Sequence, residues 1–155
     1  MSQMRCSRRL SMSVFSLLSR TILLLGIGWA ALEDLRTGKV RIILTAFLFA
    51  SGLGLKLLEG HIKIWDLLLG SCIGLGLVLL SLLSRQAIGI GDGLMFMASG
   101  ASLGLTDNLW LLLISLALSS AASIVLMVIF KYKGRNRIPF IPFMLTGYIC
   151  LLMII

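Results

Sequence analysis

The chain has 155 residues, of which 59% are hydrophobic and 13% charged, and its formal net charge is +8. A soluble globular domain carries about 25% charged residues, so this composition excludes that class. Membrane topology and contact with anionic lipid account for the positive charge, and no nucleic-acid partner is expected.

The first twelve residues, MSQMRCSRRLSM, form a basic tail ahead of an apolar segment at 15–32. A basic stretch before an apolar run is also typical of a cleaved signal peptide, but no small-residue cleavage site follows it here. The segment is therefore interpreted as the first membrane helix. Arg20 lies inside this segment, and its position relative to the bilayer stays open, because such an arginine either reaches the interface or faces the bundle interior.

Further apolar segments follow at 40–58, 64–84, 93–105, 108–130 and 140–155, the one at 93–105 being short. About 20 apolar residues in helical form cross the roughly 30 Å hydrocarbon core of a bilayer. Backbone polar groups in hydrocarbon must be satisfied within their own segment, which indicates helices. The sequence thus predicts an all-α, polytopic membrane protein with about six transmembrane helices, forming a single domain over residues 1–155.

Basic residues are unevenly distributed between the two sides of this arrangement. The connections after the first, third and fifth segments carry eight lysines and arginines, whereas the tail and the second connection carry five. The excess favours a cytoplasmic location for the odd-numbered connections, although the basic tail argues for the opposite orientation.

The number of helices between two acidic residues predicts whether they lie on the same face of the membrane or on opposite faces. Two helices lie between Asp34 and Asp92, so both residues are expected on one face, together with Glu33. The other three acidic residues, Glu59, Asp66 and Asp107, are expected on the opposite face. Only the folded bundle can bring Asp34 and Asp92 together.

Two carboxylates in one partly dehydrated site share a proton, and their apparent pKa values split. One can then activate water while the other protonates a carbonyl oxygen, which is the chemistry of aspartic proteases. Gly89, Gly91 and Gly93 in the GIGDG segment are expected to permit close approach of a substrate backbone and unusual φ angles. The alternative that Asp92 only caps a helix stays open.

No cofactor and no metal site are expected. The three cysteines form no C-x-x-C pair, and the single histidine, His61, does not make a metal site by itself. The G-x-G of GIGDG lacks the preceding strand and third glycine of a dinucleotide-binding loop. Glycines in SCIGLGLVLL and ASGLGL are predicted to serve helix packing.

Three segments together resemble the type IV prepilin peptidases, a family of membrane aspartic proteases. AIGIGDGLMFMASGASLG resembles the family's G-x-G-D segment, EDLRTGKVRIILT its first-aspartate segment, and IPFIPFMLTGYI its proline-containing sixth helix. The resemblance extends from about Ile22 onward. It implies that Asp34 and Asp92 are the catalytic pair and that Gly89, Gly91 and Gly93 shape the approach to Asp92.

The resemblance also implies a substrate and a location. The substrates would be prepilins or pseudopilins of type IV pili or type II secretion, cut after a glycine that ends a short basic leader. Cleavage would occur at the cytoplasmic face of the bacterial inner membrane, in which the protein would be a multi-pass component. The sequence does not identify the substrate pilin or the oligomeric state.

This chain departs from the family pattern at several positions. Leu94 stands where a lysine usually follows the second aspartate, and Val40-Arg41-Ile42 replaces a common I-P-N. The cysteine-paired segment of longer, methylating members is missing, so a short peptidase without N-methyltransferase activity is expected. Two alternatives stay open: an inactive relative that only binds pilins, and a small membrane transporter that uses Asp92.

Overall fold

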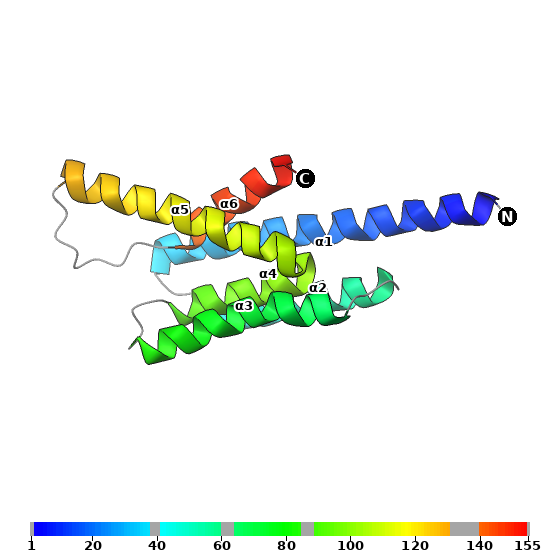
Figure 1. Ribbon diagram of the computed structural model, residues 1–155, viewed down its shortest axis with the longest axis horizontal. Helices are drawn as coiled ribbons and strands as arrows, with labels where there is room; N and C mark the ends of the chain where they lie inside the picture. The colour runs from blue at the N-terminus through cyan, green and yellow to red at the C-terminus, as the bar shows by residue number, and fades with distance from the viewer. Residues whose placement is uncertain (1, 38–40, 60–63, 85–88, 131–139, 155) are drawn as a thin grey trace.

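The computed structural model describes residues 2–37, 41–59, 64–84, 89–130 and 140–154. All of the regular structure in these ranges is helical, as the sequence predicts (Figure 1). The helices are α1 (Ser2–Thr37), α2 (Ile42–Glu59), α3 (Ile64–Leu83), α4 (Ile90–Leu103), α5 (Leu105–Phe130) and α6 (Ile141–Ile154). α1 begins at Ser2 and therefore includes most of the basic tail.

Two stretches, Trp65–Leu83 of α3 and Leu105–Val125 of α5, are long and apolar enough to cross a membrane. α2 and α6 contain shorter apolar stretches, Ile42–Leu57 and Ile141–Met153. The outer surface carries large apolar side chains, such as Leu25, Trp65 and Met153, which are more than 70% exposed. Such a surface is suited to contact with lipid. A total of about six spans stays a prediction.

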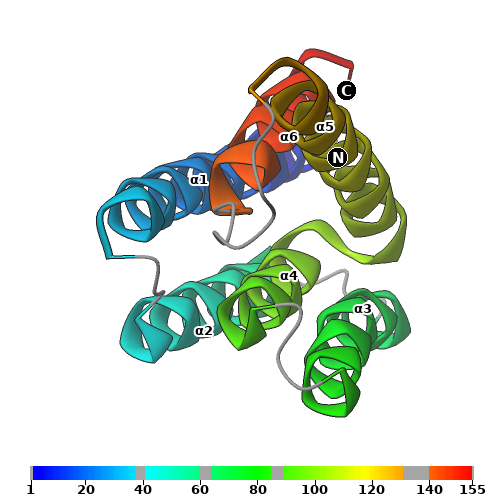
Figure 2. The same ribbon diagram turned by 90° about the vertical axis from the view of Figure 1, so that its left-hand side faces the viewer.

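α4 lies in the middle of the bundle, between α2 and α3, and α1, α5 and α6 lie together across from these three helices (Figure 2). It has 14 residues, which is about 21 Å of helix and shorter than the hydrocarbon core. Its buried residues are mostly small: Gly93, Met95, Phe96, Ala98, Ser99, Gly100, Ala101 and Ser102. Small side chains let neighbouring backbones approach closely, so this central position follows from the sequence MASGAS.

The closest approach is between α3 and α4. A Cβ atom on Gly74 would overlap the backbone of Met97, and one on Gly93 would lie 2.7 Å from Val78 Cγ2. The packing role predicted for glycines in SCIGLGLVLL is therefore confirmed at Gly74, whereas Gly76 has no neighbour within 4 Å of its Cβ position. The backbones of α3 and α4 are in contact, which fixes the helix that carries Asp92.

A buried asparagine joins three helices near the other end of α4. Asn108 is fully buried, and its Nδ2 donates hydrogen bonds to the carbonyl oxygens of Gly70 at 2.9 Å and Phe96 at 3.1 Å. Ser99 Oγ donates to Asn108 Oδ1 at 2.7 Å. These bonds link α3, α4 and α5. A buried amide without partners is costly, so the three helices must keep this arrangement to satisfy Asn108.

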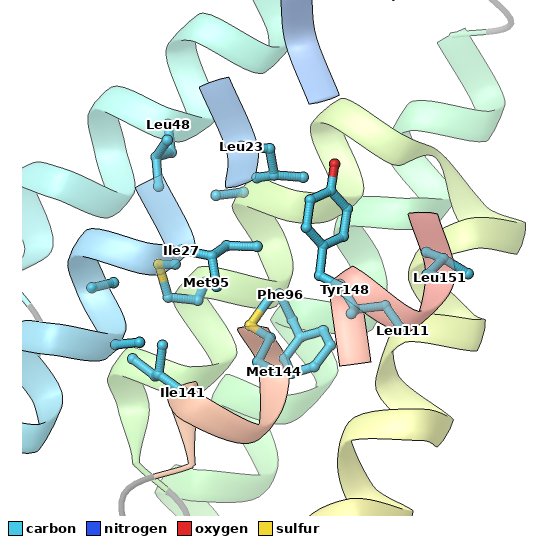
Figure 3. Close-up of a cluster of buried hydrophobic side chains, with 13 residues drawn as sticks. Leu23, Ile27, Leu48, Met95, Phe96, Leu111, Ile141, Met144, Tyr148 and Leu151 are labelled. Atoms are coloured by element: carbon cyan, nitrogen blue, oxygen red, sulfur yellow. The ribbon is translucent and has the colours of Figure 1, made fainter. Parts of the chain in front are cut away.

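The apolar core fills the space between α1, α4 and α6 (Figure 3). Its largest fully buried side chains are Leu23, Ile27, Met95, Phe96, Leu111, Ile141, Met144 and Tyr148. The Tyr148 hydroxyl donates a hydrogen bond to the carbonyl oxygen of Arg20 at 3.1 Å, which satisfies the polar end of this side chain. This bond adds to the packing of α6 against α1.

Candidate active site

Asp34 lies in the last turn of α1 and is only 8% exposed. The backbone N–H of Ile141, at the start of α6, donates a hydrogen bond to its carboxyl group. The Oδ2 atom of Asp34 is buried and has no hydrogen-bond partner among the residues that the structure describes. Burial raises the pKa of Asp34, and the Ile141 hydrogen bond offsets part of that effect.

Asp92 lies in the first turn of α4. The expected helix start at Gly93 is therefore wrong by three residues, since α4 begins at Ile90 and its N-cap is Gly89. The N–H of Asp92 donates to the carbonyl oxygen of Gly89 at 3.1 Å, and its carboxyl accepts the N–H of Gly89. This reciprocal arrangement resembles a capping box, so Asp92 stabilises the helix start without being its N-cap.

Asp34 and Asp92 belong to helix turns at the same end of the bundle, because α1 ends there and α4 and α6 begin there, at the left in Figure 1. Both lie just outside the expected spans. The pKa of Asp92 is raised to about 6, mainly by burial and further by the charge of Asp34. The negative charge of Asp34 thus makes ionisation of Asp92 less favourable.

Glu33 points to a different partner. Glu33 forms an ion pair with Arg41, which directly precedes α2, and the distance from Arg41 Nε to Glu33 Oε1 is 2.7 Å. The other acidic residues lie elsewhere: Asp66 Oδ1 accepts the N–H of Leu105 at 3.2 Å, at the opposite end of the bundle. The separation of acidic residues into two groups therefore agrees with the helix count.

The glycines around Asp92 differ in their surroundings. Gly89 has an ordinary extended backbone, with φ −66° and ψ 129°, and Gly91 is helical. The expectation of unusual φ angles is wrong there, since the described glycine with a positive φ is Gly104, at 85°. A Cβ on Gly89 would lie 2.9 Å from Asp92 Oδ2, so this position leaves space beside the carboxylate. Gly93 is buried against α3 and serves packing.

Several residues on which the sequence analysis relied, some of them only as members of the counted basic connections, lie outside the described ranges. They are Lys39, Val40, His61, Lys63, Arg85, Pro139 and the basic residues between 131 and 137. Leu94 is half-buried in α4. The pKa of Asp92 is set by burial, Asp34 and Gly89, with no contribution from a cation in the described part of the chain. In these same ranges, no group of three or more potential metal ligands occurs.

Sequence reasoning did not find the contribution of Ile141. A backbone donor leaves no mark in the residue types, so its partner is visible only once α6 packs against α1. Pro142 was the sequence feature that could have indicated this donor. A proline is compatible with the first turn of a helix, and the N–H groups of that turn have no partner within the helix.

Comparison with known proteins gives one match. A family model described as the type IV leader peptidase family matches residues 21–130, a range that contains both Asp34 and Asp92. Searches of curated proteins and of solved structures found no match.

Proposed function

The chain belongs to the type IV leader peptidase family, whose model covers more than half of it, and we propose that it is an aspartic endopeptidase. The observation that carries this proposal is the pairing of two carboxyl groups from distant helices. Asp34 is buried, and its charge raises the pKa of Asp92. Such a pair holds the single proton that acid–base hydrolysis of a peptide requires.

The proposed reaction uses one ionised and one protonated carboxyl group. The ionised carboxylate takes a proton from a water molecule, whose oxygen attacks the carbon of the scissile carbonyl group. The protonated carboxyl donates its proton to the carbonyl oxygen, which gives a tetrahedral intermediate. The C–N bond then breaks, and the leaving amine takes the proton that came from water.

We propose prepilin or pseudopilin precursors as substrates, with removal of a short basic leader at the cytoplasmic face of the bacterial inner membrane. The family description as a leader peptidase supports this class of substrate. The charge distribution supports a cytoplasmic site, because the connections on the side of Asp34 carry more basic residues. The proposal covers cleavage alone and does not include methylation of the product.

An inactive, pilin-binding relative is the second candidate, and Leu94 is the observation that favours it. A lysine at this position would stabilise ionised Asp92. With leucine at this position the pKa of Asp92 is about 6, which is still in the range for acid–base catalysis near neutral pH. A carboxyl group with this pKa exchanges protons readily near neutral pH.

Cleavage by the protein reconstituted in lipid vesicles tests this function. We expect a prepilin to lose its leader, with the new N-terminus directly after the leader glycine. A prepilin with valine in place of that glycine provides the matched control and should stay intact. An unchanged wild-type prepilin, in vesicles that contain folded protein, would favour the inactive relative.

A further inference from the structure

Glu33 is an acidic residue at the end of the bundle where α1 ends and α4 begins, at the left in Figure 1. Three of the six acidic residues in the sequence belong to helix turns at the opposite end, and these are Glu59, Asp66 and Asp107. Asp34 and Asp92 form the proposed catalytic pair. Glu33 is therefore the acidic residue at this end that the proposed mechanism does not use.

The Glu33 carboxylate is held by one exposed arginine. The distance from Arg41 Nε to Glu33 Oε1 is 2.7 Å, and the Arg41 side chain is 76% exposed, whereas that of Glu33 is 15% exposed. Glu33 Oε2 has no hydrogen-bond partner among the residues that the structure describes. The pair thus lacks the second, parallel hydrogen bond of a strong guanidinium–carboxylate contact. An ion pair with one contact and an exposed partner is weak, so another cation can replace Arg41 at little cost.

The proposed substrate brings such a cation close to Glu33. Its leader is short and basic, and it ends at the bond that is cut beside Asp34. Adjacent Cα atoms are about 3.8 Å apart, and an extended peptide advances about 3.3 Å per residue. A leader whose scissile bond lies at Asp34 therefore passes Glu33 within about three residues of that bond.

The other charges at this end of the bundle disfavour a basic leader. The connections on the side of Asp34 carry eight lysines and arginines by sequence, and Arg36 is exposed in the last turn of α1. Like charges that face each other across an interface weaken binding. A basic leader is accordingly favoured by a negative side chain outside the catalytic pair, and Glu33 supplies this charge.

We propose that Glu33 is a specificity residue that binds a lysine or arginine of the leader, and that Arg41 occupies its carboxylate when no substrate is bound. The cation of the substrate and Arg41 then compete for the same carboxylate. This inference rests on the proposed peptidase function, to which it adds the way in which the basic leader is recognised.

Binding of a synthetic peptide tests this proposal. The probe is a fluorescent peptide of three lysines, one glycine and a short apolar segment of leucine and alanine, and its control has glutamine in place of each lysine. Every form of the protein carries Asp92→Asn, which keeps the probe intact, and is reconstituted in vesicles of zwitterionic lipid. Fluorescence anisotropy gives the Kd after subtraction of binding to vesicles without protein.

We expect Glu33→Gln to weaken binding of the lysine peptide by about five- to tenfold and to leave binding of the glutamine peptide unchanged. Asp107→Asn is the matched control, because it removes the same charge at the opposite end of the bundle. It should not change the binding of either peptide. Equal losses for the two peptides in Glu33→Gln, or an equal loss in Asp107→Asn, would overturn the proposal.

Arg41→Gln separates competition from a structural role of the ion pair. Glu33→Gln and Arg41→Gln both break this pair, so a structural role alone predicts the same change in both. The proposal predicts opposite changes, because Arg41→Gln removes the competitor and should strengthen binding of the lysine peptide. Arg36→Gln removes one exposed positive charge from the same end and should strengthen binding less. Weaker binding in Arg41→Gln, or an equal gain in Arg36→Gln, would reject the competition.

The binding assay does not depend on cleavage, so it separates the two proposals. Binding that prefers lysine and requires Glu33, in a protein that cleaves no prepilin, would reject the peptidase function and retain the leader site. Cleavage of a prepilin without any preference for the lysine peptide would reject the role of Glu33 alone. With active protein, Glu33→Gln should raise KM for a prepilin with a basic leader and leave kcat unchanged, because Glu33 contacts a part of the substrate that does not react.

Discussion

Gly74→Ala tests how closely α3 must approach the helix that carries Asp92. The added methyl group would overlap the backbone of Met97, which cannot rotate away as a flexible side chain can. Overpacking of this kind costs about 1–3 kcal/mol. Alanine also gains about 1 kcal/mol over glycine in a helix, which hides part of the cost.

Gly76→Ala is the matched control, because it lies on the same helix with no atom within 4 Å of its Cβ position. The gain in helix propensity is common to both variants, so the difference between them isolates the overlap. We expect Gly74→Ala to be less stable than Gly76→Ala by about 1–3 kcal/mol. Unfolding in mixed detergent micelles, followed by circular dichroism, measures this difference. Equal stabilities would refute close backbone packing between α3 and α4.

Further predictions concern the charges and the topology. The pKa of Asp92 in the folded state, about 6, is above its unfolded value of about 3.9. The free energy of unfolding should therefore fall as the pH rises from about 4 to above 6, by up to about 3 kcal/mol. Thermal unfolding of Asp92→Asn should show a weaker pH dependence than the wild type, and an identical dependence would contradict this. Asp34→Asn removes the second-largest cause of the raised pKa of Asp92, so NMR titration should show its midpoint lowered but still above the unfolded value; no movement would argue against their proximity. Glu33→Gln should change stability by less than about 1 kcal/mol in urea or detergent unfolding, because its partner is 76% exposed; a larger loss would give the ion pair a structural role. A reporter fused at Lys133 should be cytoplasmic and one fused at Lys63 external, and the reverse pattern would invert the orientation.

The sequence predicted the helical architecture because apolar length is a strong signal in membrane proteins. The location of Asp34 and Asp92 at the same end of the bundle followed from counting helices, since each crossing reverses the chain. The start of α4 was harder to predict. Glycine-rich sequence such as GIGDG is compatible with both a loop and a first turn, so Asp92 was expected before the helix and lies inside it.

Two polar features could not be read from residue types alone. The Ile141 donor belongs to the backbone and acts on a distant helix. Asn108 was treated as the edge of an apolar segment, whereas it is fully buried and bonds to three other residues. A lone amide beside an apolar run does indicate a buried hydrogen-bonding site, but its partners depend on how three helices pack.

The most direct test of the central claim is the intact mass of a prepilin co-expressed with each variant. We expect Asp34→Asn and Asp92→Asn each to abolish leader removal while the protein still inserts in the membrane, and the double variant to be no worse, because the two carboxyl groups act as a unit. Asp66→Asn and Asp107→Asn, at the opposite end of the bundle, should leave a pilin shortened by its leader. Full cleavage by the Asp92→Asn protein, or an equal loss in Asp66→Asn, would contradict the account.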